Sequence, residues 1–412
     1  MTAFQPLDGV RVLELGNYIA APTAGRLLAD FGADVIKVER PRTGDELRRW
    51  RLHRGDTSML YRTINRGKRS VVVDLRSDEG REIVLELIRR SDVLLENFRP
   101  GTLDRWGLTE EVLEAANPEL IVARISAFGQ TGPLSDRPGF AAVAEAYGGF
   151  RELVGEPGRP PSRTGFSIGD TIAGVYTAFG VAMSLFDRVR AGAREGREGS
   201  PAPLGDRTID VALNEVMLSV TESLIPDWEA YGVRRERTGG RMEGIAPSNA
   251  YLCGDGKSIV VSGNGDSIFQ RYMAAIGRDD LASAPELQSN EGRWEARELL
   301  DDAIGAWTAG LTSGEALRLL DEAGVPSGPI YTAEDVCSDE QYAARHMVQR
   351  FDVHDGEALV EGVGFPGIVP VFGGRSLPIR HVGPDLGEHT REVLSELGWD
   401  ETAVDAYEEG LR

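Results

Sequence analysis

The sequence predicts an α/β protein, with a Rossmann-like large domain built on a parallel sheet and a smaller α+β domain. Short apolar strands alternate with amphipathic helices over residues 10–126, which is typical of a parallel sheet with helices on both faces. After Pro247 the alternation gives way to a hairpin and then to a run of helices. The length of 412 residues is more than one hydrophobic core usually holds, so two domains are expected.

The chain opens with a strand, a helix and a second strand. Residues 10–15 and 34–39 have the short apolar pattern of strands, and residues 21–31 between them form a predicted helix. Pro22 stands in the first turn of this helix, and Gly32 ends it. This is a βαβ unit, and the ligands of such sheets bind at the carboxyl ends of the strands.

The alternation continues along the chain. Further strands are expected at 70–75, 92–96 and 120–126, and further helices at 79–90, about 109–116, from Asp170 to about 186, and about 209–224. Residues 189–208 are rich in Gly, Arg and Pro and lack an apolar period, so they are expected to form a mobile surface loop.

The second domain begins with a hairpin. The runs N-A-Y-L-C and S-I-V-V-S flank a G-D-G turn and predict two paired strands. Helices are expected within 267–325, a Pro/Gly link at 326–331, a helix near 335–347, a few strands, and a closing helix at about 388–397. The expected domains are residues 1–225, residues 226–331, and residues 332–412 returning to the large domain.

Composition argues against several classes of function. A net charge of −21 argues against nucleic acid as a partner. The five histidines have no HxxxH or HExxH spacing, and Cys253 and Cys337 form no CxxC pair, so neither a metal site nor a disulfide framework is expected. We recognise no apolar run of membrane-span length and no signal-peptide pattern, so we expect a cytoplasmic protein without a membrane partner.

The charge is unevenly distributed along the chain. Residues 1–110 carry 19 Lys and Arg against 17 Asp and Glu, and the remainder is strongly acidic. The first quarter is therefore the natural place for an anionic ligand. A general abundance of surface arginine is the alternative explanation of the same count.

The opening βαβ unit also suggests a dinucleotide or S-adenosylmethionine fold. Gly16 follows the first strand, and Glu39 ends the second, where a ribose-binding acid would stand. However, the chain has no G-x-G-x-x-G here, and the bulky Tyr18 and Ile19 would prevent close approach of a pyrophosphate. The sequence therefore disfavours an oxidoreductase or a methyltransferase.

Residues 164–174 contain one acidic residue, Asp170, at the start of a predicted helix. After Asp170 the next charge is Asp187, and the uncharged, largely apolar run between them, which includes Ala and Met, predicts a buried helix with Asp170 at or near its N-cap. Gly169 allows another backbone or a ligand to approach the carboxylate closely. Asp170 is either a helix cap or a carboxylate nucleophile, and the two roles are compatible.

Several motifs occur in a fixed order, and together they resemble the family III CoA-transferases (the CaiB/BaiF family), which include formyl-CoA:oxalate and carnitine CoA-transferases and, more distantly, α-methylacyl-CoA racemase. The resemblance covers essentially the whole chain. The motifs lie at residues 6–15 (P-L-D-G-V-R-V-L-E-L), 32–41 (G-A-D-V-I-K-V-E-R-P), 65–70 (N-R-G-K-R-S), 93–101 (V-L-L-E-N-F-R-P-G), 116–121 (A-N-P-E-L-I), 169–174 (G-D-T-I-A-G) and 324–330 (G-V-P-S-G-P-I).

The resemblance implies an enzyme that moves coenzyme A from an acyl-CoA thioester to a small carboxylic acid, and an interlocked homodimer. It implies that Asp170 is the nucleophile, through an aspartyl anhydride and an aspartyl-CoA thioester. By position, the CoA contacts fall on Ile19, Ala20, Arg40, Val73, Asp74, Leu75, Arg76, Asn97, Phe98, Arg99, Arg105, Arg137, Pro138, Gly139 and Phe140. Each arginine among them could instead be an ordinary surface residue.

The chain departs from the family pattern at two places. The substrate loop implied by the resemblance falls on Gly263, Asn264 and Gly265, and the next residue, Asp266, is a departure. Two glycines permit a mobile flap. A hairpin-to-helix turn with Asp266 as N-cap is the equal alternative.

The second departure lies in residues 137–149. This segment has no His, so a racemase is disfavoured, and Ala141 stands where several transferases have an acidic residue, for which Glu145 is a possible substitute. An acyl-CoA isomerase or racemase, or a non-catalytic CoA-binding protein, remains the alternative. The donor and acceptor acids depend on how Tyr18, Phe140, Tyr147 and residues 236–266 converge.

Overall fold

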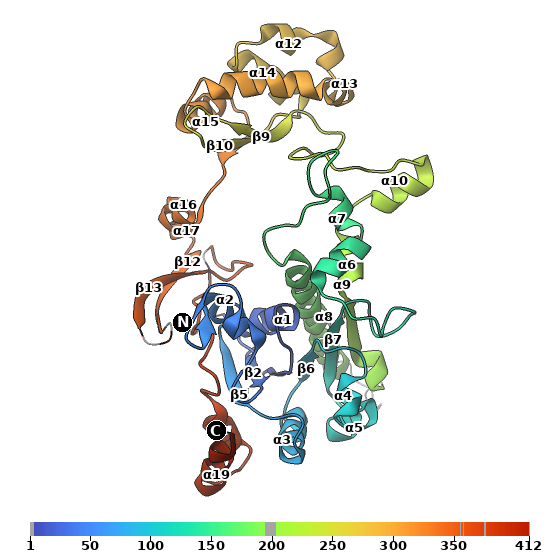
Figure 1. Ribbon diagram of the computed structural model, residues 1–412, viewed down its shortest axis with the longest axis vertical. Coiled ribbons are helices and arrows are strands. Elements are labelled where there is room, and N and C mark those ends of the chain that lie inside the picture. Colours follow the sequence, from blue (N-terminus) through green and yellow to red (C-terminus); the bar gives the residue numbers. More distant parts are fainter. Residues whose placement is uncertain (1–3, 194–202, 355, 357, 375, 412) are drawn as a thin grey trace. The chain divides into compact units, whose positions relative to one another are not determined.

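The computed structural model describes residues 4–193, 203–354, 356, 358–374 and 376–411. The chain divides into two compact units (Figure 1). The first, which we call the sheet unit, comprises residues 1–150, 164–222 and 339–412, and the second, the helical unit, comprises residues 151–163 and 223–338. Residues 151–163, which the sequence analysis left in the large domain, group with the helical unit.

The sheet unit contains six parallel strands in the order β5-β2-β1-β6-β7-β8. Their bounds are β1 Arg11–Glu14, β2 Asp34–Glu39, β5 Lys68–Val72, β6 Val93–Glu96, β7 Ile121–Ser126 and β8 Thr208–Ala212. In chain order this is the arrangement 3-2-1-4-5-6, which confirms the predicted Rossmann-like fold. The order reverses between β1 and β6, so a ligand is expected beyond the carboxyl ends of these two strands.

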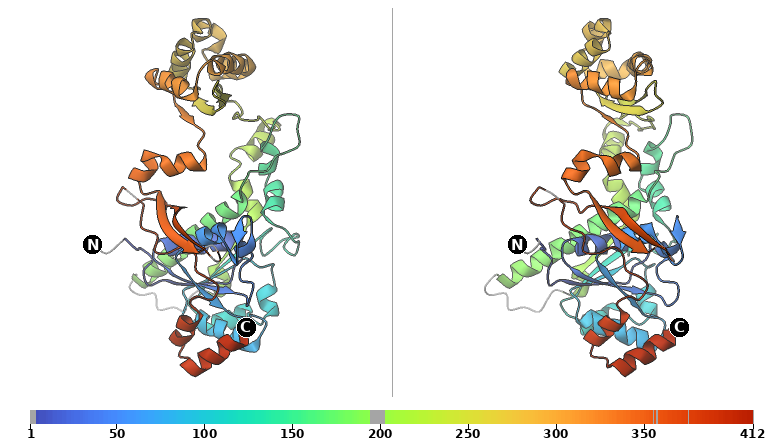
Figure 2. Two further views of the ribbon diagram at one scale, coloured as in Figure 1. Left: turned by 60° about the vertical axis from the view of Figure 1, so that its left-hand side comes forward. Right: turned by 90° about the vertical axis from the view of Figure 1, so that its left-hand side faces the viewer.

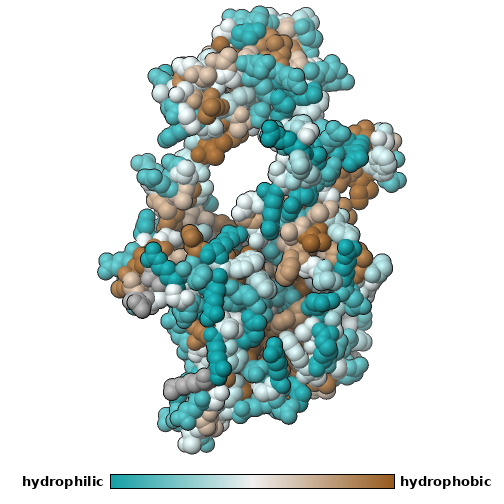
Figure 3. All heavy atoms as spheres, viewed as in Figure 1, coloured by the Kyte–Doolittle hydropathy of each residue, from teal (hydrophilic) through white to brown (hydrophobic). Residues whose placement is uncertain are grey.

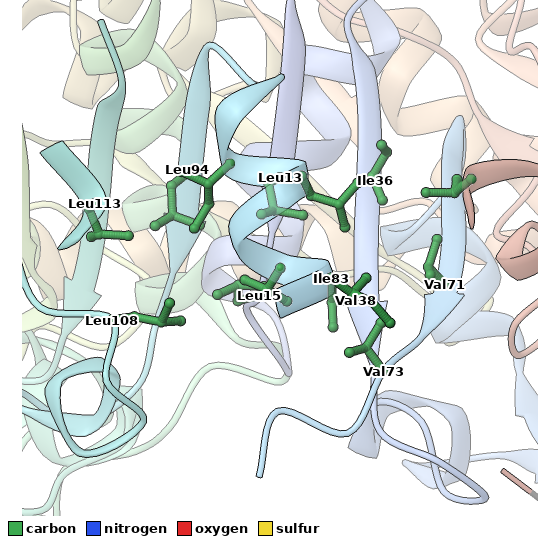
Figure 4. Packing of buried hydrophobic residues seen from close by; sticks show 14 of the residues in the cluster. Leu13, Leu15, Ile36, Val38, Val71, Val73, Ile83, Leu94, Leu108 and Leu113 are labelled. Carbon is green, nitrogen blue, oxygen red and sulfur yellow. The ribbon is translucent and has the colours of Figure 1, made fainter. Parts of the chain in front are cut away.

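Apolar side chains cover both faces of the sheet. On one face they pack against α3 (Asp78–Arg89), α5 (Glu110–Ala116) and the C-terminal helices α18 (Thr390–Glu396) and α19 (Glu401–Leu411), as Figure 4 shows for part of this core. On the other face they pack against α1 (Ala20–Asp30) and α8 (Ile168–Ala193) (Figure 2). Burial on both sides explains why these strands are continuously apolar.

The remaining elements of the sheet unit lie around this core. They are η1 (Glu46–Arg49), β3 (His53–Arg54), β4 (Thr57–Ser58), α2 (Met59–Ile64), α4 (Thr102–Arg105), α6 (Ala141–Tyr147), η2 (Leu204–Arg207), α9 (Leu213–Ser219), α17 (Glu340–Ala344), β12 (Val348–His354) and β13 (Leu359–Pro366). The short helix α7 (Phe150–Leu153) lies where the chain passes into the helical unit.

Two sequence expectations about the sheet unit are wrong. The helix expected at about 209–224 starts instead as β8, because Thr208–Ala212 pairs with β7 and supplies the sixth strand. The apolar run continues from strand into helix α9 without a break, so periodicity alone could not separate them. The loop expected at 189–208 is helical up to Ala193, and residues 194–202 lie outside the described part of the chain.

The helical unit has a small antiparallel sheet in the order β11-β10-β9. The predicted hairpin is confirmed as β9 (Ser248–Leu252) and β10 (Ser258–Ser262), while the expected link at 326–331 supplies the third strand, β11 (Ser327–Pro329). The other elements are α10 (Leu224–Tyr231), α11 (Asp266–Ala275), α12 (Asp279–Ser283), η3 (Pro285–Leu287), α13 (Asn290–Glu295), α14 (Arg297–Ala309), α15 (Ser313–Glu322) and α16 (Ala333–Ser338).

Helix α8 is longer and more apolar than the sequence analysis allowed. Residues 168–190 are long and apolar enough to cross a membrane by length and composition alone. A third of an 18-residue window within them is buried, so the helix expected to be buried is buried only in part. Val181 and Leu185 of this helix pack into the core of the sheet unit. A core helix passes the same test, so this single helix is weak evidence for a membrane span. Figure 3 shows apolar residues mixed with polar ones on the viewed face of the molecule.

Candidate active site

A cavity of about 290 Å³ opens where the strand order reverses. Seven residues expected at the ligand site line it: Arg40, Val73, Asp74, Leu75, Arg76, Asn97 and Phe98. All of them follow the carboxyl ends of β2, β5 or β6, which is the edge at which ligands of this fold bind. The structure therefore brings together seven of the fifteen expected ligand residues.

The cavity has eight further lining residues, and one of them, Tyr18, was expected from the sequence to shape the pocket. The other seven were not among the expected ligand contacts: Leu15, Asn17, Val38, Glu39, Glu46, Thr102 and Trp106. The Trp106 ring stands edge-on to Phe98, with ring centroids 5.0 Å apart, so the cavity has an aromatic wall. Leu15, Val38 and Glu39 end the strands β1 and β2 or follow them directly, and this position was the signal that could have identified them.

A larger cavity of about 810 Å³ lies beside the first and shares Arg40, Asp74 and Arg76 with it. Arg42 and residues of α19, among them Tyr407, line its other walls. The linings of the two cavities combine apolar side chains, guanidinium groups and carboxylates.

The remaining expected ligand residues lie outside these cavities. Ile19 and Ala20 are buried at the start of α1, so only their backbone can face a ligand. The Arg99 guanidinium donates to the Asp136 carbonyl, and that of Arg105 donates to the Thr102 hydroxyl. In the segment that leads into α6, Arg137 donates to the Tyr147 hydroxyl, Gly139 packs against Ala127 and Phe128, and Pro138 precedes the exposed Phe140.

The turn between β1 and α1 is held by side chains from other elements. The Asn97 side chain accepts the Asn17 N–H at 2.9 Å and donates to the Asn17 carbonyl at 2.7 Å. The Lys37 ammonium donates to the Gly16 carbonyl at 2.7 Å. The Asp45 carboxylate accepts the Tyr18 N–H at 3.1 Å. The backbone of this turn is thus fixed at the edge of the cavity.

Tyr18 needs these contacts because its backbone is strained. Its φ angle is 62°, in the left-handed region that costs a residue with a Cβ about 1–2 kcal/mol. In this conformation its ring meets Trp50 at 5.3 Å and Phe140 at 5.9 Å between centroids. The three rings form an aromatic cluster that the sequence analysis foresaw only in part, since Trp50 was missed.

A cluster of four buried charges lies under the turn. Lys37 pairs with Asp45 at 2.8 Å and with Glu14 at 3.0 Å, and Lys68 pairs with Glu14 at 2.7 Å. None of the four side chains is exposed. Burial lowers the pKa of Lys68 to about 8, although Glu14 opposes this shift. Burial also lowers the pKa of Lys37, but Asp45 and Glu14 outweigh it and raise that pKa above its usual range.

Glu39 and Arg48 form a second buried pair beside this cluster. The guanidinium donates to both carboxylate oxygens, at 2.8 and 2.7 Å. Burial raises the pKa of Glu39, but the hydrogen bonds and charge of Arg48 outweigh it and hold that pKa down at about 2. Glu39 is therefore an anchor for η1 and not a ribose ligand.

Asp170 is the third residue of α8, so it lies inside the first turn rather than at the cap. Other helices pack closely against α8 on either side of Asp170 along the chain. An added Cβ on Gly169 would lie 3.5 Å from both the Ala141 Cβ and the Glu145 Cγ of α6. An added Cβ on Gly174 would lie 2.8 Å from the Ala20 carbonyl oxygen of α1. Asp170 therefore lies on α8 between the contact with α6 at Gly169 and the contact with the start of α1 at Gly174.

The substrate loop expected at Gly263, Asn264 and Gly265 belongs to the helical unit, and it is anchored there. The buried Arg293 donates to the Asn264 carbonyl at 2.8 Å and to the Asp266 carboxylate at 2.7 Å. Gly265, and not Asp266, is the N-cap of α11. The alternative that Asp266 caps this helix is therefore wrong, and its side chain ties the loop to Arg293 instead.

No group of three or more His, Cys, Asp or Glu side chains that could hold a metal ion occurs in the described part of the chain. The smaller cavity is lined by carboxylate, amide, guanidinium and aromatic groups.

Comparison with known proteins gives consistent matches along the whole chain. The model of CoA-transferase family III matches residues 7–390. Succinyl-CoA–D-citramalate CoA-transferase of Chloroflexus aurantiacus is 42% identical over 95% of this chain and 94% of its own length. Succinate–glutarate CoA-transferase of Agrobacterium fabrum is 34% identical over 95% of this chain and 96% of its own. A CAIB/BAIF family protein from Brucella suis is 33% identical, with a TM-score of 0.81 over 95% of this chain and 99% of that one.

Proposed function

Because the chain belongs to CoA-transferase family III, we propose that it moves CoA from an acyl-CoA thioester to a free carboxylic acid with Asp170 as the nucleophile. One observation carries this proposal. The second turn of α8 packs at Gly174 against Ala20 and Thr23 of α1, and α1 begins directly after the turn that lines the cavity. We therefore propose that the reactive end of a ligand bound there lies beside Asp170, one turn earlier on α8.

In the first half-reaction the Asp170 carboxylate attacks the carbonyl carbon of the donor thioester. The carbon–sulfur bond breaks, CoA leaves as a thiolate, and an aspartyl–acyl anhydride remains. The thiolate then attacks the aspartyl carbonyl of this anhydride and releases the donor acid as a carboxylate. Aspartate side chains are ordinarily ionised at neutral pH, so the attack requires no general base.

The second half-reaction repeats these steps in reverse. The acceptor carboxylate attacks the aspartyl-CoA thioester, which gives a new anhydride and frees the thiolate again. The thiolate attacks the acyl carbonyl of the acceptor, so the new acyl-CoA forms and the Asp170 carboxylate is restored. No proton is gained or lost over the cycle, and water must be kept from the anhydride.

The cavities provide groups that suit the CoA molecule. Phe98, Trp106 and Leu75 offer an apolar wall for the adenine ring or the pantetheine arm. Arg40 and Arg76, which the two cavities share, suit the phosphate groups, because guanidinium binds phosphate oxygens in pairs. We assign the nucleotide end of CoA to these arginines.

Named relatives use succinyl-CoA or succinate together with a second carboxylic acid. We therefore take succinyl-CoA as the donor to test first. Cys253 and Cys337 are both free thiols, which supports a reducing, cytoplasmic setting.

We also propose a homodimer, supported by an exposed apolar stripe on α8. Tyr176, Phe179, Met183 and Phe186 recur at helical spacing, and each is between 42% and 63% exposed. A stripe of this kind is typical of a surface that another chain covers. Sedimentation analysis tests this part of the proposal, and a monomer at micromolar concentration would refute it.

The deciding experiment is capture of the covalent intermediate. The enzyme is incubated with succinyl-CoA, quenched with hydroxylamine or borohydride, digested, and analysed by mass spectrometry. We expect modification of Asp170 and a loss of activity of several orders of magnitude in Asp170→Asn. Asp187→Asn, on the exposed side of the same helix, is the matched control and should retain activity.

Two outcomes favour the alternatives. Product formation from an acyl-CoA without an acceptor acid would indicate an isomerase or racemase. Full function of Asp170→Ala, with Asp170 always unmodified, would indicate a non-catalytic CoA-binding protein.

A further inference from the structure

A short basic segment, residues 49–54, lies next to the aromatic cluster. It reads Arg-Trp-Arg-Leu-His-Arg and contains no acidic residue, in a chain whose net charge is −21. We call it the arginine loop. All six of its residues are exposed. The Arg49 and Arg51 guanidinium groups pair with no carboxylate among the residues that the structure describes.

Both ends of the arginine loop are fixed. Before it, the buried Arg48 donates to Glu39 and, at 2.6 Å, to the Tyr61 hydroxyl. After it, β3 and β4 form a hairpin, and the Ser58 hydroxyl donates to the Leu47 carbonyl at 2.6 Å. The exposed cations are therefore presented on an anchored support, which lowers the entropy lost when they bind a ligand.

Backbone strain marks the contact between the arginine loop and the Tyr18 turn. Arg51 has a φ angle of 58°, and it directly follows Trp50, whose ring contacts that of the strained Tyr18. Left-handed residues with a Cβ are uncommon, and they persist where the surroundings hold them, often at binding sites. Two such residues on either side of one aromatic contact therefore point to a binding role for this surface.

The aromatic contacts lead from the arginine loop to the nucleophile within the same unit. Trp50 contacts Tyr18, and Tyr18 contacts Phe140. Phe140 precedes Ala141, which packs against Gly169 at the start of α8. These contacts connect the arginine loop with the start of α8, on which Asp170 lies, within one unit.

We propose that the arginine loop binds the distal carboxylate of a dicarboxylic acyl group, with Arg51 and Arg49 as its ligands and with Trp50 and Tyr18 along its methylene groups. This inference rests on the proposed function and names the substrate class of that site. A dicarboxylic acyl-CoA carries a second carboxylate that never reacts and needs a cation. Guanidinium groups bind carboxylates with two parallel hydrogen bonds and keep their charge at any physiological pH.

The test compares two substrates of equal length. Succinyl-CoA and butyryl-CoA differ only in a carboxylate against a methyl group at the distal end. For the wild type, Arg49→Gln, Arg51→Gln and the double variant, kcat/KM is measured with each substrate. Arg89→Gln, an exposed arginine of α3 paired with Glu86, is the control for loss of one positive charge.

We expect Arg51→Gln to lower the succinyl-to-butyryl ratio of kcat/KM by about 10- to 100-fold, as for loss of a charged hydrogen bond. The double variant should lower it further, while butyryl-CoA turnover and the Arg89→Gln ratio stay within about twofold of wild type. Arg51→Lys keeps the charge without the paired donors and should recover part of the ratio.

An unchanged succinyl-to-butyryl ratio of kcat/KM in the double variant overturns the inference. An equal fall of kcat/KM for both substrates also overturns it, because the loop would then bind CoA itself or support the fold. A dimer that dissociates in the double variant with its ratio intact assigns the loop to the subunit interface and also overturns it. The proposed function is judged separately. If Asp170 still captures the acyl-CoA while the ratio stays constant, only the arginine-loop assignment fails.

Discussion

Replacing Asp45 with Asn tests the role of the buried charges under the Tyr18 turn. The carboxylate pairs with Lys37 at 2.8 Å and accepts the backbone N–H of Tyr18 at 3.1 Å and of Leu47 at 2.9 Å. An amide oxygen can still accept both N–H groups. The amide NH₂, however, meets the Lys37 ammonium, and the cluster of two lysines and two acids acquires a net positive charge.

The magnitude follows from burial. Removing one partner of a buried ion pair costs about 3–5 kcal/mol, and the retained hydrogen bonds place Asp45→Asn at the low end, about 3 kcal/mol. At about 2–4 °C per kcal/mol this lowers the melting temperature by roughly 6–12 °C. Because the turn lines the cavity, we also expect KM for the acyl-CoA to rise more than kcat falls.

The assay is thermal and urea unfolding followed by circular dichroism, together with steady-state kinetics. Asp56→Asn, at an exposed residue eleven positions further along the chain, is the matched control and should change stability by less than about 0.5 kcal/mol. An Asp45→Asn protein that melts within 1 °C of wild type, with an unchanged KM, would refute the reasoning. It would mean that the Lys37–Asp45 pair neither stabilises the fold nor positions the turn.

Three further predictions concern other contacts of the site and its surroundings. Burial raises the pKa of Glu96 to about 7, so between about pH 4.5 and 7 the folded state keeps a proton that the unfolded state has lost. The free energy of unfolding therefore falls as pH rises through this window. Glu96→Gln should abolish that fall when urea unfolding is compared at pH 5 and pH 8. Asn97→Ala removes both hydrogen bonds to Asn17, so KM for the acyl-CoA should rise about tenfold by kinetics while the fold is retained by circular dichroism; an unchanged KM would contradict this. Arg293→Met should lower the free energy of unfolding by about 3 kcal/mol or more in urea, because it leaves buried carbonyl groups without a hydrogen-bond donor. Asp266→Asn, at an exposed carboxylate, should cost less than about 1 kcal/mol. Equal effects of the two variants would contradict the anchoring role of Arg293.

The sheet of the large unit was largely predictable, because its strands are short, apolar and separated by clear helix signals. Residues 34–39 form β2 at the predicted bounds. Local pattern failed where pairing decides the structure. Residues 208–212 become a strand only because β7 offers an edge, and residues 327–329 only because β10 does.

The site was predictable where function depends on position along a strand. The family resemblance implied Arg40 and Asn97 as ligand residues, both directly follow strands, and both line the cavity. The buried charges were not predictable. Lys37 looks like an ordinary charge in an apolar strand, and its partners Glu14 and Asp45 come from other elements, so no local pattern reveals that all three are buried together.

Stability alone does not explain why the chain buries two lysines and two acids there, because apolar residues of similar volume are often as stable as a buried ion pair. Such residues could not bind the Gly16 carbonyl or the Tyr18 N–H, however, and both groups lie at the cavity edge. The double variant Lys37→Met with Asp45→Leu separates the two effects. It should regain much of the stability that Asp45→Asn loses, while KM for the acyl-CoA stays raised. If both KM and stability instead returned to their wild-type values, the buried charges would not position the turn. The strained backbone of Tyr18 would then have to be held by other contacts.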